Sequence, residues 1–190
     1  MAHVPADSIA VLERSYGAMA RVAAFAGASP AEVETVVRDA AVAASAGAPD
    51  DLRHELFREL IVRVAALERA AGRAVAVEPA PDPVPPVADE HFGPAGSPWD
   101  GFFFEMPPSF NELRPGGSKA ERARAVAETA LAESPLGNRI VVVLRDVDGW
   151  TAEEVAALLG VDVELQRVAL HGGRARIRQA LEDIASEGDA

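Results

Sequence analysis

The feature that most constrains this chain is a series of helix start and stop signals between residues 134 and 181. Ser134 followed by Pro135 can begin a helix, because a hydroxyl caps free N–H groups and proline is tolerated in the first turn. A second helix is predicted to begin at Thr151, where Glu154, three residues later, completes a capping box. These signals predict short, closely spaced helices.

The second and third of these helices are separated by only a few residues. Gly160 can adopt the left-handed conformation that ends a helix, and Asp162 can cap the helix that follows. This spacing is typical of a helix-turn-helix, whose second helix reads bases in the major groove. Two adjacent glycines, Gly172 and Gly173, each cost about 1 kcal/mol relative to alanine. We therefore expect the third helix to kink or end there.

The segment VLRDVDGWTAEEVAALLGV, followed by Leu170, His171 and an arginine-rich tail, resembles the C-terminal domain of the extracytoplasmic-function group of bacterial sigma-70 factors. The helices expected over 12–27, 32–45 and 50–70 are similar in outline to the first domain of the same family. The resemblance implies a transcription initiation factor that binds the RNA polymerase core and a −35-type promoter element. An anti-sigma factor is a further partner that it implies.

Aligned on the Leu-His pair, the resemblance implies a set of DNA-binding side chains, namely Arg167, His171, Arg174, Arg176 and Arg178. The central serine and arginine of the family's helix are Val168 and Ala169 here. With Leu165 they share one helix face. This face indicates either a surface for a partner protein or a second copy of the chain, or a rotated helix that packs it inward and turns Gln166 outward.

The resemblance also implies a polymerase- or partner-binding face on the second helix. Glu34 and Asp39 match acidic positions of the family's polymerase-binding helix, and Arg38 lies beside them. The family's aspartate, glutamine, phenylalanine and tryptophan on this helix are missing. Partner binding is therefore expected through charged groups at Glu34, Arg38 and Asp39.

The net charge of −12 argues against a simple nucleic-acid binder, because such binding depends on Lys and Arg at phosphates. Residues 76–117 carry seven acidic side chains, one basic side chain and most of the 14 prolines. We expect an extended linker there, between helical bundles in 1–75 and 118–190. Trp99 and Phe103 belong to an aromatic cluster in this linker, which either folds back into a groove or stays exposed for a partner.

Apolar residues recur at helical spacing and strand signals are nearly absent, so the chain is predicted to be all-α. The absence of cysteine excludes disulfides and fits a reducing cytoplasm. No apolar run reaches the roughly 18 residues of a membrane span. We therefore expect a cytoplasmic protein that does not cross the membrane.

Enzymatic chemistry is not expected. The four histidines are scattered, and the glycine-containing segments lack the strand and helix of a phosphate-binding loop. We predict no catalytic residue, no metal and no cofactor. The leading function is transcription initiation or its regulation. The alternative is a protein-interaction module with little DNA binding, either a decoy for an anti-sigma factor or a dimerising regulator.

Overall fold

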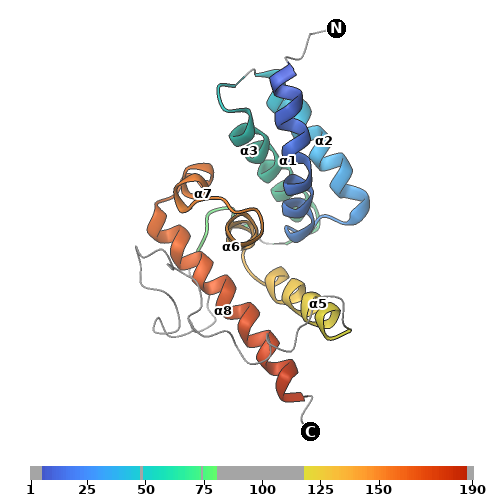
Figure 1. The fold of residues 1–190 in the computed structure, drawn as a ribbon, viewed down its shortest axis with the longest axis vertical. Coiled ribbons are helices and arrows are strands. Elements are labelled where there is room, and N and C mark those ends of the chain that lie inside the picture. The colour runs from blue at the N-terminus through green and yellow to red at the C-terminus, as the bar shows by residue number, and fades with distance from the viewer. Residues whose placement is uncertain (1–5, 48, 74, 81–117, 188–190) are drawn as a thin grey trace.

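The structure, a computed structural model, describes residues 6–47, 49–73, 75–80 and 118–187. All regular elements in these ranges are helices (Figure 1), which confirms the all-α prediction for this part of the chain. In chain order they are α1 (Ala6–Phe25), α2 (Pro30–Ala46), α3 (Leu52–Ala70), α5 (Ser118–Ala132), α6 (Leu136–Val142), the π-helical turn η2 (Val143–Val147), α7 (Ala152–Leu159) and α8 (Val163–Glu187). Trp99 and Phe103 lie outside the described residues.

Helices α1, α2 and α3 gather at one end of the molecule (Figure 1). α2 begins after Ser29, whose backbone N–H donates to the Glu32 carboxylate at 2.8 Å. α3 begins after Asp51, whose carboxylate accepts from the backbone N–H of His54 at 2.9 Å. These caps pair backbone groups that a helix end leaves free. The inner faces of the three helices share a core that includes Met19, Val22, Val37, Phe57 and Leu60.

Helix α8 continues through Gly172 and Gly173, so the predicted kink or end at this point is wrong. The reason is close packing on α6. A Cβ atom at Gly173 would lie less than 3.0 Å from Cγ2 of Val142. Glycine therefore lets the two helices approach each other, and the packing gained offsets the helix propensity lost.

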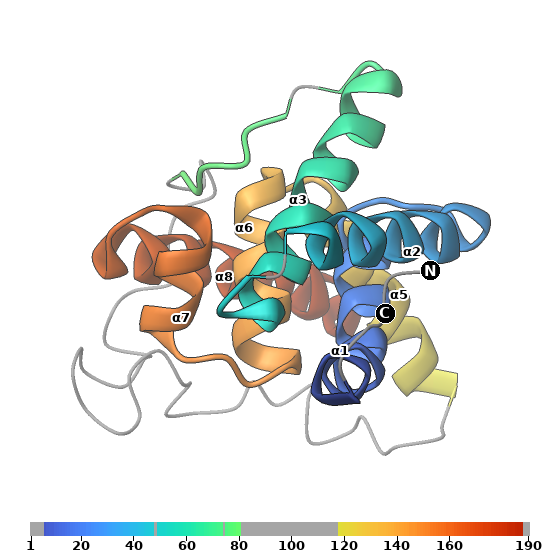
Figure 2. The same cartoon turned by 90° about the horizontal axis from the view of Figure 1, so that it is seen from above.

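The helices before residue 81 and the helices after residue 117 contribute to one buried core. Leu136, Ile140 and Leu144 of α6 and η2 belong to the same cluster of contacting side chains as Phe57 and Leu60 of α3. Figure 2 shows α6 passing behind α3, with α7 on one side and α1 on the other. The helices before and after residues 81–117 are therefore packed against each other.

The chain that follows α3 is held on the start of α6. The backbone N–H of Gly137 donates to Ala76 O at 3.0 Å. The side chain of Asn138 exchanges two hydrogen bonds with the backbone of Ala80, at 2.8 and 3.0 Å. A Cβ atom at Gly137 would overlap this backbone. The first residues of the predicted linker, 76–80, are thus part of the packed structure.

None of the described helices combines the length and the apolar character needed to cross a bilayer.

Candidate nucleic-acid interface

The predicted helix-turn-helix signals are confirmed in α7, the turn and α8. The backbone N–H of Glu154 donates to Thr151 Oγ1 at 3.2 Å, and the Glu154 carboxylate accepts from the Thr151 N–H at 2.8 Å. Gly160 ends α7 with φ 69° and ψ 32°, the left-handed conformation that favours glycine. Asp162 accepts from the backbone N–H of Leu165 at 2.6 Å. A short, capped turn therefore fixes how α8 follows α7.

The basic side chains predicted to contact DNA all lie on α8, and several are paired with carboxylates. Arg167 donates two hydrogen bonds to Glu164, at 2.6 and 3.0 Å. Arg174 donates to Asp146 at 2.9 Å, and Arg174 and His171 are both buried. Of the predicted set, Arg167 alone lies in the first two turns of α8, where a recognition helix reads bases. Among the predicted residues it is the best placed for a base contact.

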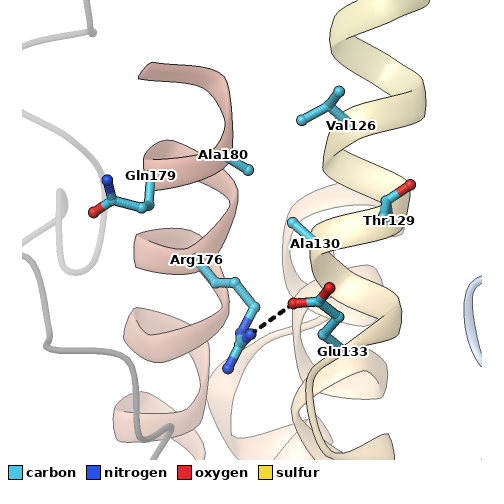
Figure 3. Close-up of a pocket in the computed structure, with 7 residues that line it drawn as sticks. All are labelled: Val126, Thr129, Ala130, Glu133, Arg176, Gln179 and Ala180. Atoms are coloured by element: carbon cyan, nitrogen blue, oxygen red, sulfur yellow. Dashed lines mark hydrogen bonds and ion pairs between the residues drawn. The ribbon is translucent and has the colours of Figure 1, made fainter. Parts of the chain in front are cut away.

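Arg176 and Arg178 lie farther along α8. Figure 3 shows Arg176 extending toward α5, where its guanidinium lies 3.3 Å from the Glu133 carboxylate. α5 and α8 border a groove of about 310 Å³ here, which is lined by Val126, Thr129, Ala130, Glu133, Arg176, Gln179 and Ala180. Arg178 is half-buried. Arg176 therefore joins α8 to the residue that directly follows α5.

Acidic side chains lie at the starts of both helices of the helix-turn-helix. Glu153 and Glu154 lie in the first turn of α7, and Asp162 and Glu164 lie at the start of α8. All four are exposed. Hydrogen bonds from Arg167 lower the pKa of Glu164 from its usual 4.5, so this carboxylate is charged at neutral pH. Carboxylates repel phosphates, which weakens any DNA contact near these helix starts.

The apolar face predicted from Leu165, Val168 and Ala169 is divided between the core and its edge. Ala169 is fully buried, whereas Leu165 and Val168 are half-buried. The expectation that Gln166 points outward is wrong, because Gln166 is 1% exposed. The inward stripe of α8 consists of Gln166, Ala169, Leu170 and Gly173, at helical spacing. Of the three predicted residues, Leu165 and Val168 remain accessible to a partner.

The charged residues predicted to bind a partner on α2 are all exposed. These are Glu34, Arg38 and Asp39, and Arg38 Nε lies 3.5 Å from Asp39 Oδ1. The structure therefore leaves all three side chains accessible and pairs Arg38 with Asp39.

Three contacts that sequence reasoning missed join α1 and α3 to the turn before α7. Arg21 Nε donates to Asp148 Oδ1 at 2.9 Å. The guanidinium carbon of Arg53 lies 4.0 Å from the Trp150 ring centre, and the ring of Phe57 meets Trp150 edge-on with centroids 4.8 Å apart. The one signal in the sequence was Trp150 itself, because an aromatic side chain at a turn requires a surface to cover it.

A buried ion pair joins α3 to α6. Arg139 Nη2 lies 2.9 Å from Glu68 Oε2, and the two side chains are 6% and 2% exposed. Arg73 also forms an ion pair with Glu68. Burial alone would raise the pKa of Glu68, but hydrogen bonds from Arg73 and Arg139 outweigh it and hold the pKa below 4.5. Glu68 is therefore charged at neutral pH and depends on both arginines.

No protein-family model matches the chain, and no curated protein matches its sequence. Inference about function therefore depends on the residues and their geometry.

Proposed function

We propose that the chain is a cytoplasmic helix-turn-helix transcription factor that resembles the extracytoplasmic-function sigma factors and binds the RNA polymerase core and −35-type promoter DNA. The main observation in support is the turn between α7 and α8, with Thr151 and Asp162 as caps and Gly160 in the left-handed conformation. This geometry is the one by which a helix-turn-helix presents its second helix to a major groove. Arg167 would supply the contact with DNA.

In this proposal, α1 to α3 correspond to the family's first domain and α5 to α8 to its promoter-reading domain, with residues 81–117 connecting them. The exposed charged side chains of Glu34, Arg38 and Asp39 on α2 are the surface proposed for the polymerase. Exposed charges of both signs suit a polar rim contact, which steers association more than it adds affinity.

The DNA contact can be tested by fluorescence anisotropy. The full chain is titrated onto labelled promoter-length duplexes between 50 and 200 mM salt. Each phosphate contact contributes a slope of about −0.9 to the dependence of log affinity on log salt concentration. We expect weak binding with little sequence preference, and Arg167→Gln should reduce the slope by about one contact. Arg69→Gln, at an exposed site near the end of α3, removes the same charge and should change little.

Nanomolar, sequence-selective binding at physiological salt that survives Arg167→Gln would contradict this assignment of the contact. For the polymerase contact, purified core enzyme should retain the wild-type chain on a column. The same column should release a variant with alanine at Glu34, Arg38 and Asp39 at lower salt. Equal retention of both chains would place the polymerase surface elsewhere.

A second candidate function is a protein-interaction module with little DNA binding. It is favoured by the pairing of Arg167, Arg174 and Arg176 with carboxylates. The acidic residues at the starts of α7 and α8 favour it as well. Val168→Arg tests it, because Val168 lies at the edge of the core. If Val168 contacts a second copy of the chain, sedimentation should show a wild-type dimer and a folded, monomeric variant.

Val163→Arg is the matched control, since Val163 is exposed on the same helix. A wild-type chain that is monomeric at all concentrations would reject the dimerising form of this function. Unfolding of the Val168 variant alone would instead place Val168 in the core.

A further inference from the structure

A pocket of about 480 Å³ lies between helices α1 and α3 and the end of η2 with the turn that follows it. Helix α1 forms one wall, α3 supplies Arg53 and Phe57, and the turn before α7 supplies Asp148 and Trp150. This volume is in the range of small-molecule sites, roughly 300 to 1,000 Å³. The pocket is therefore built by residues from both sides of the segment 81–117.

The pocket concentrates positive charge in a chain whose net charge is −12. Three arginines line it, Arg14, Arg21 and Arg53, against one carboxylate, Asp148. Arg21 is paired with Asp148, and Arg53 with Glu154 at 3.4 Å. Within the described part of the chain, Arg14 has no carboxylate partner. Arg14 is exposed and therefore free to bind an anion at the rim.

Two buried polar atoms belong to residues that line this pocket. Within the described residues, Asp148 Oδ2 and Trp150 Nε1 have no hydrogen-bond partner. The Asp148 side chain is 2% exposed and Trp150 is 3% exposed. Both atoms are closed to solvent, so a ligand in the pocket does not contact them. Its polar contacts must come from the arginines that line the pocket.

The aromatic walls limit what the ligand can be. Arg53 covers one face of Trp150. The rings of Phe57 and Trp150 meet in an edge-to-face contact. Trp150 is almost fully buried, so it offers no free face on which a nucleobase could stack. The side chains of Val11 and Val147 add apolar lining. These walls favour a small aliphatic molecule.

We propose that this pocket binds a small organic oxyanion, a phosphate or carboxylate. Arg14 and Arg53 hold the anionic group through charge-assisted hydrogen bonds. Trp150 lines the same pocket, so its indole signal can report on binding. The site does not depend on the proposed DNA or polymerase contacts.

Binding can be followed at Trp150 itself in the full chain by ¹H–¹⁵N NMR of the indole N–H groups. The chain has two tryptophans, so Trp99→Phe assigns the Trp150 signal. Glycerol 3-phosphate is the probe, and glycerol, which lacks the anion, is compared with it. We expect the Trp150 signal to shift and to saturate with glycerol 3-phosphate, and glycerol to have little effect at the same concentrations.

Arg14→Gln should weaken the apparent affinity for glycerol 3-phosphate by about tenfold, the loss expected from one charge-assisted hydrogen bond. Because Arg14 is exposed and unpaired among the described residues, this variant should fold normally. Arg69→Gln removes an equal charge near the far end of α3 and should leave the affinity unchanged.

The proposal is overturned if the Trp150 signal does not shift saturably at tens of millimolar probe. It is also overturned if the two glutamine variants weaken binding equally, because general charge would then explain it. A Trp150 shift caused by a short DNA duplex, but not by glycerol 3-phosphate, and lost in Arg14→Gln would assign the site to nucleic-acid phosphate instead.

Discussion

The ion pair between Glu68 and Arg139 predicts an unequal response to the loss of its two members. Both side chains are buried, and Arg139 has Glu68 as its ion-pair partner among the described residues. Glu68 has a second partner, because Arg73 also binds it. Removal of Glu68 therefore strands a buried guanidinium, whereas removal of Arg139 leaves the carboxylate paired.

We expect Glu68→Met to lower the free energy of unfolding by about 3–5 kcal/mol, the cost of leaving one member of a buried pair uncompensated. Arg139→Met should cost about 1.5–3 kcal/mol, the loss of one hydrogen bond between charged groups. The double variant should be more stable than the sum of these costs predicts, because methionine can fill both volumes without a buried charge. The coupling energy should exceed about 1 kcal/mol.

Urea unfolding at pH 7, followed by circular dichroism at 222 nm, measures all four proteins. The slope of the unfolding free energy against urea concentration should be the same for all four proteins, so that shifts in the midpoint report stability alone. Two results would refute the reasoning. One is an Arg139→Met variant that is less stable than Glu68→Met. The other is additivity of the two single costs within about 0.5 kcal/mol.

Three further outcomes follow from the same packing. The pKa of Glu68 is lower in the folded state than in the unfolded state. The charged carboxylate therefore stabilises the fold above pH 4.5, and this contribution is lost as the pH falls through the pKa of the folded state. The urea midpoints of the wild type and Glu68→Gln should accordingly converge as the pH is lowered from 5 to 3. Gly173→Ala should lower stability by about 1–3 kcal/mol, because its Cβ would meet Val142, and Val142→Ala should restore part of the loss in thermal melts. Gly137→Ala should destabilise by a similar amount, about 1–3 kcal/mol, by displacing the backbone after α3, whereas Gly47→Ala, which meets open space, should not lower the melting temperature.

The sequence predicted the helix-turn-helix well because its signals are local. The Thr151 capping box, the Gly160 turn and the Asp162 cap each depend on backbone groups within four residues. The caps at Ser29 and Asp51 are local in the same way. Such interactions can be derived from residue order alone.

The features that the sequence did not predict depend on contacts between distant residues. The continuity of α8 through Gly173 follows from Val142, which lies on another helix. The burial of Gln166 shows that the inward face of α8 is one position away from the face that the rotated-helix alternative placed inward. The π-helical turn η2 was also missed. It closes with a hydrogen bond from Asp148 N–H to Val143 O at 3.1 Å, one residue longer than the α-helical spacing.

The buried ion pair also has a consequence for how the chain folds during synthesis. Glu68 is made 71 residues before Arg139, so at about 5–20 residues per second roughly 4–14 s pass between them. In that time α3 carries Glu68 with Arg73 as its counterion, and Phe57 has not yet met Trp150. The first three helices are therefore completed by the second half of the chain. Pulse proteolysis of ribosome-bound chains of increasing length should show α1 to α3 gaining full protection once Trp150 has emerged, and full protection of a chain that ends at Ala80 would contradict this order.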